Sequence, residues 1–113
     1  MKYQNNLLKS TMNLGIENET LEFKKTTGEL KKAVVSISSM INKHGIATLY
    51  FGVSPKEEVL GQDLYEETLR NVSQAIAENI KPQIYPTIEK QTLDGKSVIK
   101  IEANGDEMPY IYI

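Results

Sequence analysis

The sequence predicts a two-layer α+β sandwich, in which a mixed sheet of about five to six strands has two main helices on one face. Two observations support this prediction. Two segments place apolar residues at helical spacing, and several short segments alternate apolar and polar residues as strands do. The segments follow one another without a repeat or a linker, and helices packed on one side of a sheet is the natural arrangement for such a set.

The first elements lie in the N-terminal third of the chain. Residues 1–16 are expected to form a loose arm or a short helix. Residues 19–25 alternate, with Leu21 and Phe23 on one side, as in a strand with one buried face. A helix follows, with Thr26 as its expected N-cap. Its apolar stripe is Leu30, Ala33, Val34, Ile37, Met40 and Ile41, and Gly45 is expected to end it.

The middle of the chain predicts two strands and a second helix. Residues 48–53 are rich in β-branched and aromatic side chains, as in a central strand covered on both sides. A brief strand is expected at residues 58–61. The second helix begins near Glu66 and is stopped by Lys81-Pro82. Its apolar stripe is Leu69, Val72, Ile76 and Ile80.

The C-terminal third predicts a hairpin and a last strand. Asp94-Gly95 is a type I′ turn signal between strands at residues 87–93 and 97–103. Pairing about this turn sets Glu89 opposite Lys100 and Ile88 opposite Ile101. The last expected strand is 109–113. We expect residues 17–113 to be a domain of a longer protein, truncated at this strand.

Length and composition exclude several classes of protein. A chain of 113 residues allows one compact domain, and 40% hydrophobic with 25% charged residues is typical of a globular protein. No run approaches the roughly 18 apolar residues of a spanning helix, and the N-terminus lacks a signal-peptide pattern. We therefore expect a cytoplasmic protein with no membrane contact.

The chemistry open to the chain is limited. The absence of cysteine and the single histidine exclude thiol nucleophiles, zinc-thiolate centres and multi-histidine sites. No phosphate-binding glycine loop or serine-hydrolase elbow is present. We expect no cofactor. The net charge of −2 and the single arginine, Arg70, argue against a broadly basic surface and against sequence-specific readout, so a nucleic-acid-binding face has to be a local lysine patch.

One candidate site combines acids with a lysine. If Leu21 and Phe23 face the core, Glu22 and Lys24 project together from the other face, with Glu17 just before the strand. Carboxylates beside a lysine are the groups that magnesium-dependent phosphodiester cleavage needs. The residues alone favour the simpler interpretation, a solvated strand face.

A second candidate site is a set of lysines around the start of the first helix. These are Lys24, Lys25, Lys31 and Lys32. The N–H groups of a helix start also favour an anion, so this region could hold a phosphate. The alternative is that Lys31 and Lys32 are only the polar face of the helix. Lys43 and His44 are interpreted as cations of its last turn.

Tyrosines are a weaker signal for nucleic acid. Six are present, and they could stack on unpaired bases. Packing is the favoured role. Only Tyr110 and Tyr112 are expected to share one face of a strand.

The ordered motifs resemble a known family. Leu21-Glu22-Phe23-Lys24, Phe51-Gly52-Val53, Val59-Leu60-Gly61, Ile80-Lys81-Pro82 and Val98-Ile99-Lys100-Ile101 are similar to the Schlafen-type Alba-like domain of bacteria and archaea. The resemblance implies a DNA- or RNA-binding domain, commonly the N-terminal part of larger transcriptional regulators. Such a domain is expected to have nucleic acid and further domains of its own chain as partners.

The resemblance also implies an enzymatic alternative. Animal Schlafen proteins include RNA endonucleases with a metal-binding acidic triad, and its first two acids resemble Glu17 and Glu22. Where the third acid is expected, this chain has Ser54-Pro55-Lys56. One of three nearby acids would have to substitute for it: Glu57, Glu58 or Asp63.

Three hypotheses follow. The leading one is a non-catalytic nucleic-acid-binding module that contacts phosphates through Lys24, Lys25, Lys31 and Lys32. The second is an endoribonuclease that uses Mg²⁺ or Mn²⁺, with Glu17 and Glu22 as ligands and Lys24 on the phosphate. The third is a protein-interaction domain or a homodimer.

Overall fold

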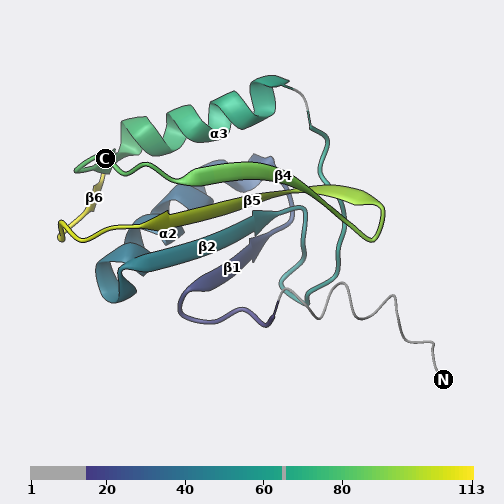
Figure 1. Ribbon diagram of the computed structural model, residues 1–113, viewed down its shortest axis with the longest axis horizontal. Helices are drawn as coiled ribbons and strands as arrows, with labels where there is room; N and C mark the ends of the chain where they lie inside the picture. The colour runs from purple at the N-terminus through teal and green to yellow at the C-terminus, as the bar shows by residue number, and fades with distance from the viewer. Residues whose placement is uncertain (1–14, 65) are drawn as a thin grey trace.

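The computed structural model describes residues 15–64 and 66–113, which form two helices and six strands (Figure 1). The expected arm at residues 1–16 lies outside the described residues except for its last two positions. The helices are α2 (Leu30–His44) and α3 (Glu66–Asn79), and a 3-10 turn, η1 (Thr27–Glu29), precedes α2. The strands are β1 (Leu21–Lys24), β2 (Ile46–Phe51), β3 (Ile80–Lys81), β4 (Thr87–Leu93), β5 (Lys96–Asn104) and β6 (Ile111–Tyr112).

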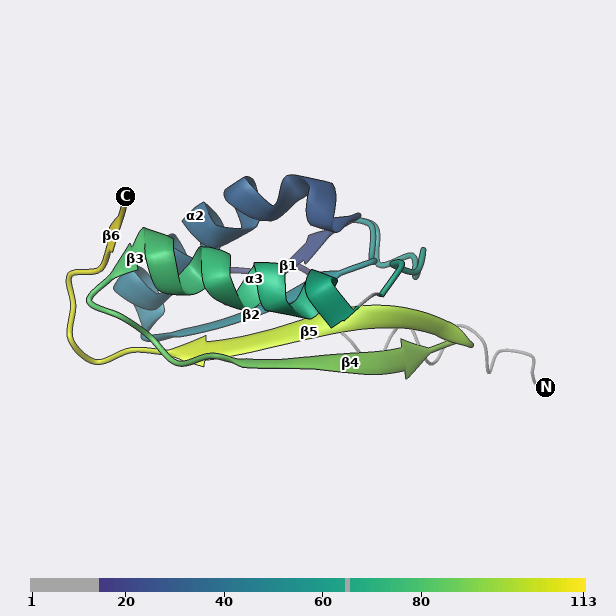
Figure 2. The same ribbon diagram turned by 90° about the horizontal axis from the view of Figure 1, so that it is seen from above.

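Four of the strands form a mixed sheet in the order β1-β2-β5-β4. β1 is parallel to β2, and the other neighbours are antiparallel. β3 and β6 form a separate antiparallel pair. Figure 2 shows both helices on the same side of the four-stranded sheet. The predicted α+β fold with two helices on one face is confirmed, but the described strands divide between two sheets instead of forming one.

The main core lies between the helices and the four-stranded sheet. Leu49 and Phe51 of β2 and Ile99 and Ile101 of β5 are fully buried there. The helices contribute the apolar stripes that their spacing predicts, with Ala33, Val34, Ile37, Met40, Ile41, Val72 and Ile76 buried. The helices are therefore held mainly by packing onto the sheet.

A smaller core lies on the opposite face of the sheet. Strand alternation directs Phe23 and Tyr50 away from the helices, and their rings meet edge to face with centroids 6.0 Å apart. Val53, Val59 and Val98 complete this cluster. The side chains next to Phe23 along β1 consequently point toward α2, and this direction positions the candidate site.

The predicted signals at both ends of the first helix are confirmed with one modification. Thr26 Oγ1 accepts the N–H of Gly28 at 2.9 Å, but the turn that it caps is η1, and α2 begins at Leu30. Glu29 Oε2 accepts the N–H of Lys25, the residue before Thr26, at 3.2 Å. Gly45 ends α2 with φ 78°, and its N–H donates to the carbonyl of Ile41.

The hairpin has the predicted turn and register. Asp94 and Gly95 have positive φ values of 52° and 75°, as a type I′ turn requires, and Glu89 lies opposite Lys100. The ion pair differs from the expectation, because Lys100 Nζ lies 3.6 Å from Glu102 Oε2 on its own strand. Lys100 Nζ also lies 5.9 Å from the centre of the Tyr50 ring. The register thus holds without the cross-strand charge pair.

Two strand assignments need correction. Residues 58–61 form no strand; only an isolated bridge between Val53 and Val59 is present there. Short strand β3 was not predicted, because Ile80 completes the apolar stripe of α3 and its pairing with Tyr112 has no local signal. No helix in the described part of the chain is both long and apolar enough to span a bilayer.

Candidate nucleic-acid interface

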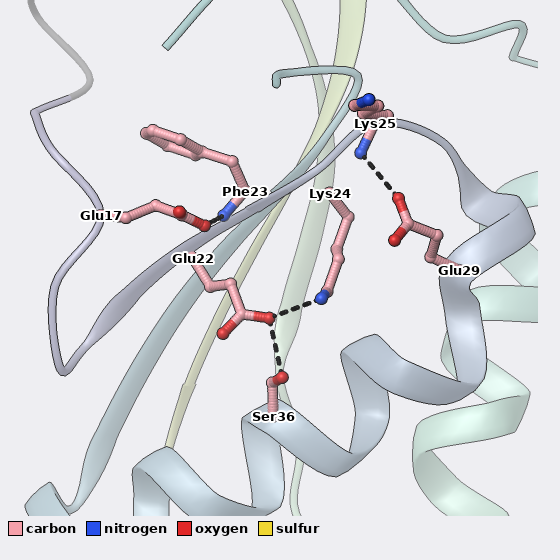
Figure 3. A network of polar contacts seen from close by, with 7 residues as sticks. All are labelled: Glu17, Glu22, Phe23, Lys24, Lys25, Glu29 and Ser36. Atoms are coloured by element: carbon pink, nitrogen blue, oxygen red, sulfur yellow. Dashed lines mark hydrogen bonds and ion pairs between the residues drawn. The ribbon is translucent and has the colours of Figure 1, made fainter. Parts of the chain in front are cut away.

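Glu22 and Lys24 form a polar network with α2 (Figure 3). Lys24 Nζ lies 3.0 Å from Glu22 Oε2, and the Ser36 hydroxyl donates to the same oxygen at 2.7 Å. Only 27% of the Glu22 side chain and 18% of the Lys24 side chain are exposed. The two side chains project together, as the sequence predicts, but they contact a helix instead of forming a solvated face. The Lys24 charge is consequently neutralised within the fold.

Glu17 has a different role from Glu22. Its Oε2 accepts the N–H of Phe23 at 2.8 Å, so the carboxylate holds the backbone of β1 (Figure 3). Glu17 and Glu22 do line one surface pocket of about 610 Å³, together with Lys24 and Lys25. Sequence analysis brings these residues together correctly, but it does not reveal that each carboxylate already has a protein partner.

The acids do not form the triad that the nuclease alternative needs. Within residues 15–64 and 66–113, no three acidic or histidine side chains are placed to hold one metal ion. Neither Glu57, Glu58 nor Asp63 lines the pocket that contains Glu17 and Glu22. The donor set therefore does not fit a dedicated divalent-metal site.

Three of the four predicted phosphate-contacting lysines are exposed. Lys25 lies in the turn between β1 and η1, while Lys31 and Lys32 lie in the first turn of α2. No ion pair joins any of the three to an acid among the described residues, in contrast to Lys24. We call Lys25, Lys31 and Lys32 the lysine turn. The charges of these three lysines therefore remain available to bind an anion that is not part of the domain.

The sequence did not indicate the roles of three residues, two of them beside this site and the third at the other end of the sheet. Ser36 lies on the flank of the α2 stripe, and no local pattern connects it with Glu22. Lys56, in the loop between β2 and α3, is exposed and lines a pocket with Lys25. Its only signal was that it stands near the place of an expected acid. Asn42 holds the backbone of Tyr110 through two hydrogen bonds, of 2.6 and 2.7 Å.

The last turn of α2 has the expected cations. His44 Nε2 lies 3.1 Å from Glu19 Oε2, so His44 interacts with an acid as well as with the helix end. Lys43 is exposed. A surface pocket of about 440 Å³ lies between this end of α2 and Glu22. These residues are separated from the lysine turn by the length of α2.

The described tyrosines mostly pack. Tyr50 and Tyr110 are buried, and Tyr112 is half-buried against the main core. The packing role that the sequence favours is therefore confirmed for Tyr110 and Tyr112. Tyr85 differs, because it is 84% exposed. It lies in the segment between β3 and β4, beside Gly45 and the end of β5, at the opposite end of the sheet from Lys24.

The fold and site define a small α+β domain with an exposed lysine turn beside a neutralised acid–lysine network. The chain belongs to the Schlafen, AlbA_2 family, whose model matches residues 17–112. This result confirms the resemblance seen in the sequence motifs. No curated protein matches the chain.

Two solved structures share the fold. One is the DIP2311 protein from Corynebacterium diphtheriae, with a TM-score of 0.66 and 14% identity over 93% of this chain. The other is the N-terminal domain of a RecG-related protein from Nitrosomonas europaea, with a TM-score of 0.60 and 15% identity over 95% of this chain. This chain covers 22% of the DIP2311 chain and 76% of the RecG-related one. At such low identity, the likeness concerns the fold alone.

Proposed function

We propose that this domain binds nucleic acid without sequence specificity, through backbone phosphates, as a module of a larger regulatory protein. The observation that most supports the proposal is the lysine turn, in which Lys25, Lys31 and Lys32 are exposed and have no acidic partner among the described residues. Cations in this state release counterions from phosphates when they bind, and this release drives non-specific affinity.

Lys24 has a smaller part in the proposal than the sequence suggests. Its ammonium is paired with Glu22 and its side chain is 18% exposed, so a phosphate would have to compete with that carboxylate. We assign Lys24 the role of positioning Glu22 against Ser36. The phosphate contacts are assigned to the lysine turn.

The arginine pattern supports binding without base readout. Arg70, the only arginine, is on α3, and its Nη2 lies 3.9 Å from Glu66 Oε1. Lysine lacks the planar fork that reads guanine through two hydrogen bonds. Lysine contacts to phosphate position a protein on a nucleic acid but do not select a sequence.

The comparisons support a role within a larger protein. The family resemblance implies DNA- or RNA-binding domains, and this chain covers only 22% of the DIP2311 chain. The RecG-related relative is described as a candidate DNA helicase, and its matching part is the N-terminal domain. We infer that the present domain binds nucleic acid and so brings other domains of its own full-length chain to it.

A salt titration tests the proposed function. Affinity for duplex, single-stranded and structured nucleic acid is measured by fluorescence anisotropy at several salt concentrations. On duplex DNA the logarithm of affinity should fall with the logarithm of salt, with a slope near −0.9 for each phosphate contacted. The absence of binding to all three probes at low salt would overturn the proposal.

A homodimer remains an alternative proposal with its own observation. Ile111 of β6 is 57% exposed and Ile113 is 61% exposed, and a strand edge with apolar side chains can pair with another chain. Sedimentation of the wild-type chain and of Ile111→Lys would decide. A dimer that the substitution disrupts supports this alternative, and a wild-type monomer at high concentration excludes it.

A further inference from the structure

Lys25 has a cationic neighbour that the sequence separates from it by 31 positions. Lys56 and Lys25 line one surface pocket of about 400 Å³. Both are exposed, and within the described chain neither is joined to an acid by an ion pair. The pocket is also lined by Ser54, Pro55, Glu58 and Leu60. Two lysines from separate segments therefore face one concave site.

The two segments are tied together by the backbone. The N–H groups of Gly52 and Val53 donate to the carbonyl of Lys24 at 2.8 and 3.3 Å. This carbonyl directly precedes Lys25, and Val53 directly precedes the loop that contains Lys56. The end of β1 and the start of the loop after β2 therefore keep a fixed relation.

The loop itself is held by a buried hydroxyl. Ser54 is 7% exposed, and its Oγ accepts the N–H groups of Lys56 and Glu58, each at 3.2 Å. Its own N–H donates to the carbonyl of Glu58 at 2.8 Å. Pre-organisation of this kind lowers the entropy that a flexible loop loses when it binds a ligand. The backbone at Lys56 is thus positioned before an anion arrives.

We propose that Lys25 and Lys56 together bind one phosphate group of the nucleic acid in this pocket, so that the loop between β2 and α3 belongs to the interface. This inference rests on the proposed function. Lysine ammonium groups bind phosphate as point charges and need no fixed fork geometry, so two of them on either side of a pocket suit one phosphate. Glu58 is the opposing charge in the pocket, and it weakens the attraction.

Single substitutions with opposite signs test the inference. Because Lys25 stays in the pocket, Lys56→Gln should lower affinity at low salt, and Lys25→Gln combined with Lys56→Gln should lower the magnitude of the log–log salt slope on duplex DNA by about 0.9, the value for one phosphate contact. Glu58→Gln should raise affinity at low salt, because a carboxylate that repels the phosphate is removed. Lys90→Gln, at an exposed lysine of β4, is the matched control and should leave the slope unchanged. Unfolding of the variants cannot explain a higher affinity in Glu58→Gln together with a lower affinity in Lys56→Gln.

Failure of the inference differs from failure of the proposed function. A wild-type domain that binds, together with a Lys56→Gln variant of unchanged affinity and a Lys25→Gln, Lys56→Gln variant of unchanged slope, would overturn the inference alone. A wild-type domain that binds no nucleic acid overturns both. Amide NMR shifts distinguish the source of the phosphate: if Lys25 and Lys56 respond to inorganic phosphate but not to an oligonucleotide, the pocket binds a free anion and the inference is wrong.

Discussion

Lys24 and Lys25 are neighbours in the sequence but belong to different regions of the molecule. Lys24 is directed toward α2, where it pairs with Glu22 in a half-buried network with Ser36 (Figure 3). Lys25 follows the strand and is exposed, and its backbone N–H donates to Glu29 Oε2. The end of β1 thus separates a lysine held within the fold from a lysine at the surface, so a lysine pair in a sequence is not a pair of equivalent binding groups.

The largest expected effect comes from reversing the charge of all three residues of the lysine turn. The triple variant Lys25→Glu, Lys31→Glu, Lys32→Glu should lose most nucleic-acid affinity, and its slope magnitude should fall by about 2.7, three times the value for one contact. The matched control, Lys43→Glu, Lys81→Glu, Lys90→Glu, has the same change in net charge at exposed lysines elsewhere. Equal losses in the two variants would contradict a localised interface.

Single alanine substitutions should separate the two neighbours. Lys24→Ala should destabilise the domain by about 1 to 2 kcal/mol, because it leaves the half-buried Glu22 carboxylate without its cation. Lys25→Ala should change stability by less than about 0.5 kcal/mol, as exposed substitutions usually do. Urea unfolding measures both. Similar free energies of unfolding for the two variants would show that the network has no structural role.

Removal of Glu22 tests the acidic side of the comparison. In a folded Glu22→Ala domain the Lys24 charge is released, so affinity for nucleic acid should rise several-fold at low salt. The same variant examines the endonuclease alternative, in which cleavage of structured RNA with Mg²⁺ or Mn²⁺ depends on Glu22. Cleavage by the wild-type protein that the substitution abolishes would support the enzyme and contradict our proposal.

Within the network of Glu22, Lys24 and Ser36, the smallest effect is expected at Ser36. Ser36→Ala removes one hydrogen bond to the Glu22 carboxylate, which still has Lys24 as its ion-pair partner. The free energy of unfolding should therefore fall by about 1 kcal/mol. Nucleic-acid affinity should not change, because the lysine turn is untouched. A clear drop in affinity, measured by anisotropy on a variant with wild-type thermal stability, would place the Ser36 hydroxyl in the interface.

Local chemistry made much of the fold predictable. The α2 stripe, its glycine end and the Asp94-Gly95 hairpin each depend on residues close in sequence. The expected strand at residues 58–61 failed for a related reason, because Ser54 organises that segment as a loop through its hydroxyl. A hydroxyl that satisfies two backbone N–H groups removes donors that a ladder would use.

The sequence predicted which residues form the candidate site but not how far each is buried or which partner it contacts. The motif around Glu22 and Lys24 and the lysine cluster were visible in the sequence. Their burial and hydrogen bonds depend on contacts between distant segments, such as the one between Glu22 and Ser36, 14 positions apart. The same holds for Lys25 and Lys56, which meet only because β1 pairs with β2. Contacts between distant segments therefore decide which lysines are available to a ligand, and no local sequence pattern indicates these contacts.

The contact between Asn42 and Tyr110 has a consequence for how the chain folds. It joins residues 68 positions apart, and the chain between them includes β5, which lies in the sheet between β2 and β4. Non-local contacts of this kind require large loops to close, which slows folding. During synthesis the first half of the domain leaves the ribosome without the strand that completes its sheet. The hydrogen bonds between Asn42 and Tyr110 can therefore form only late in synthesis, once the segment around Tyr110 has been made.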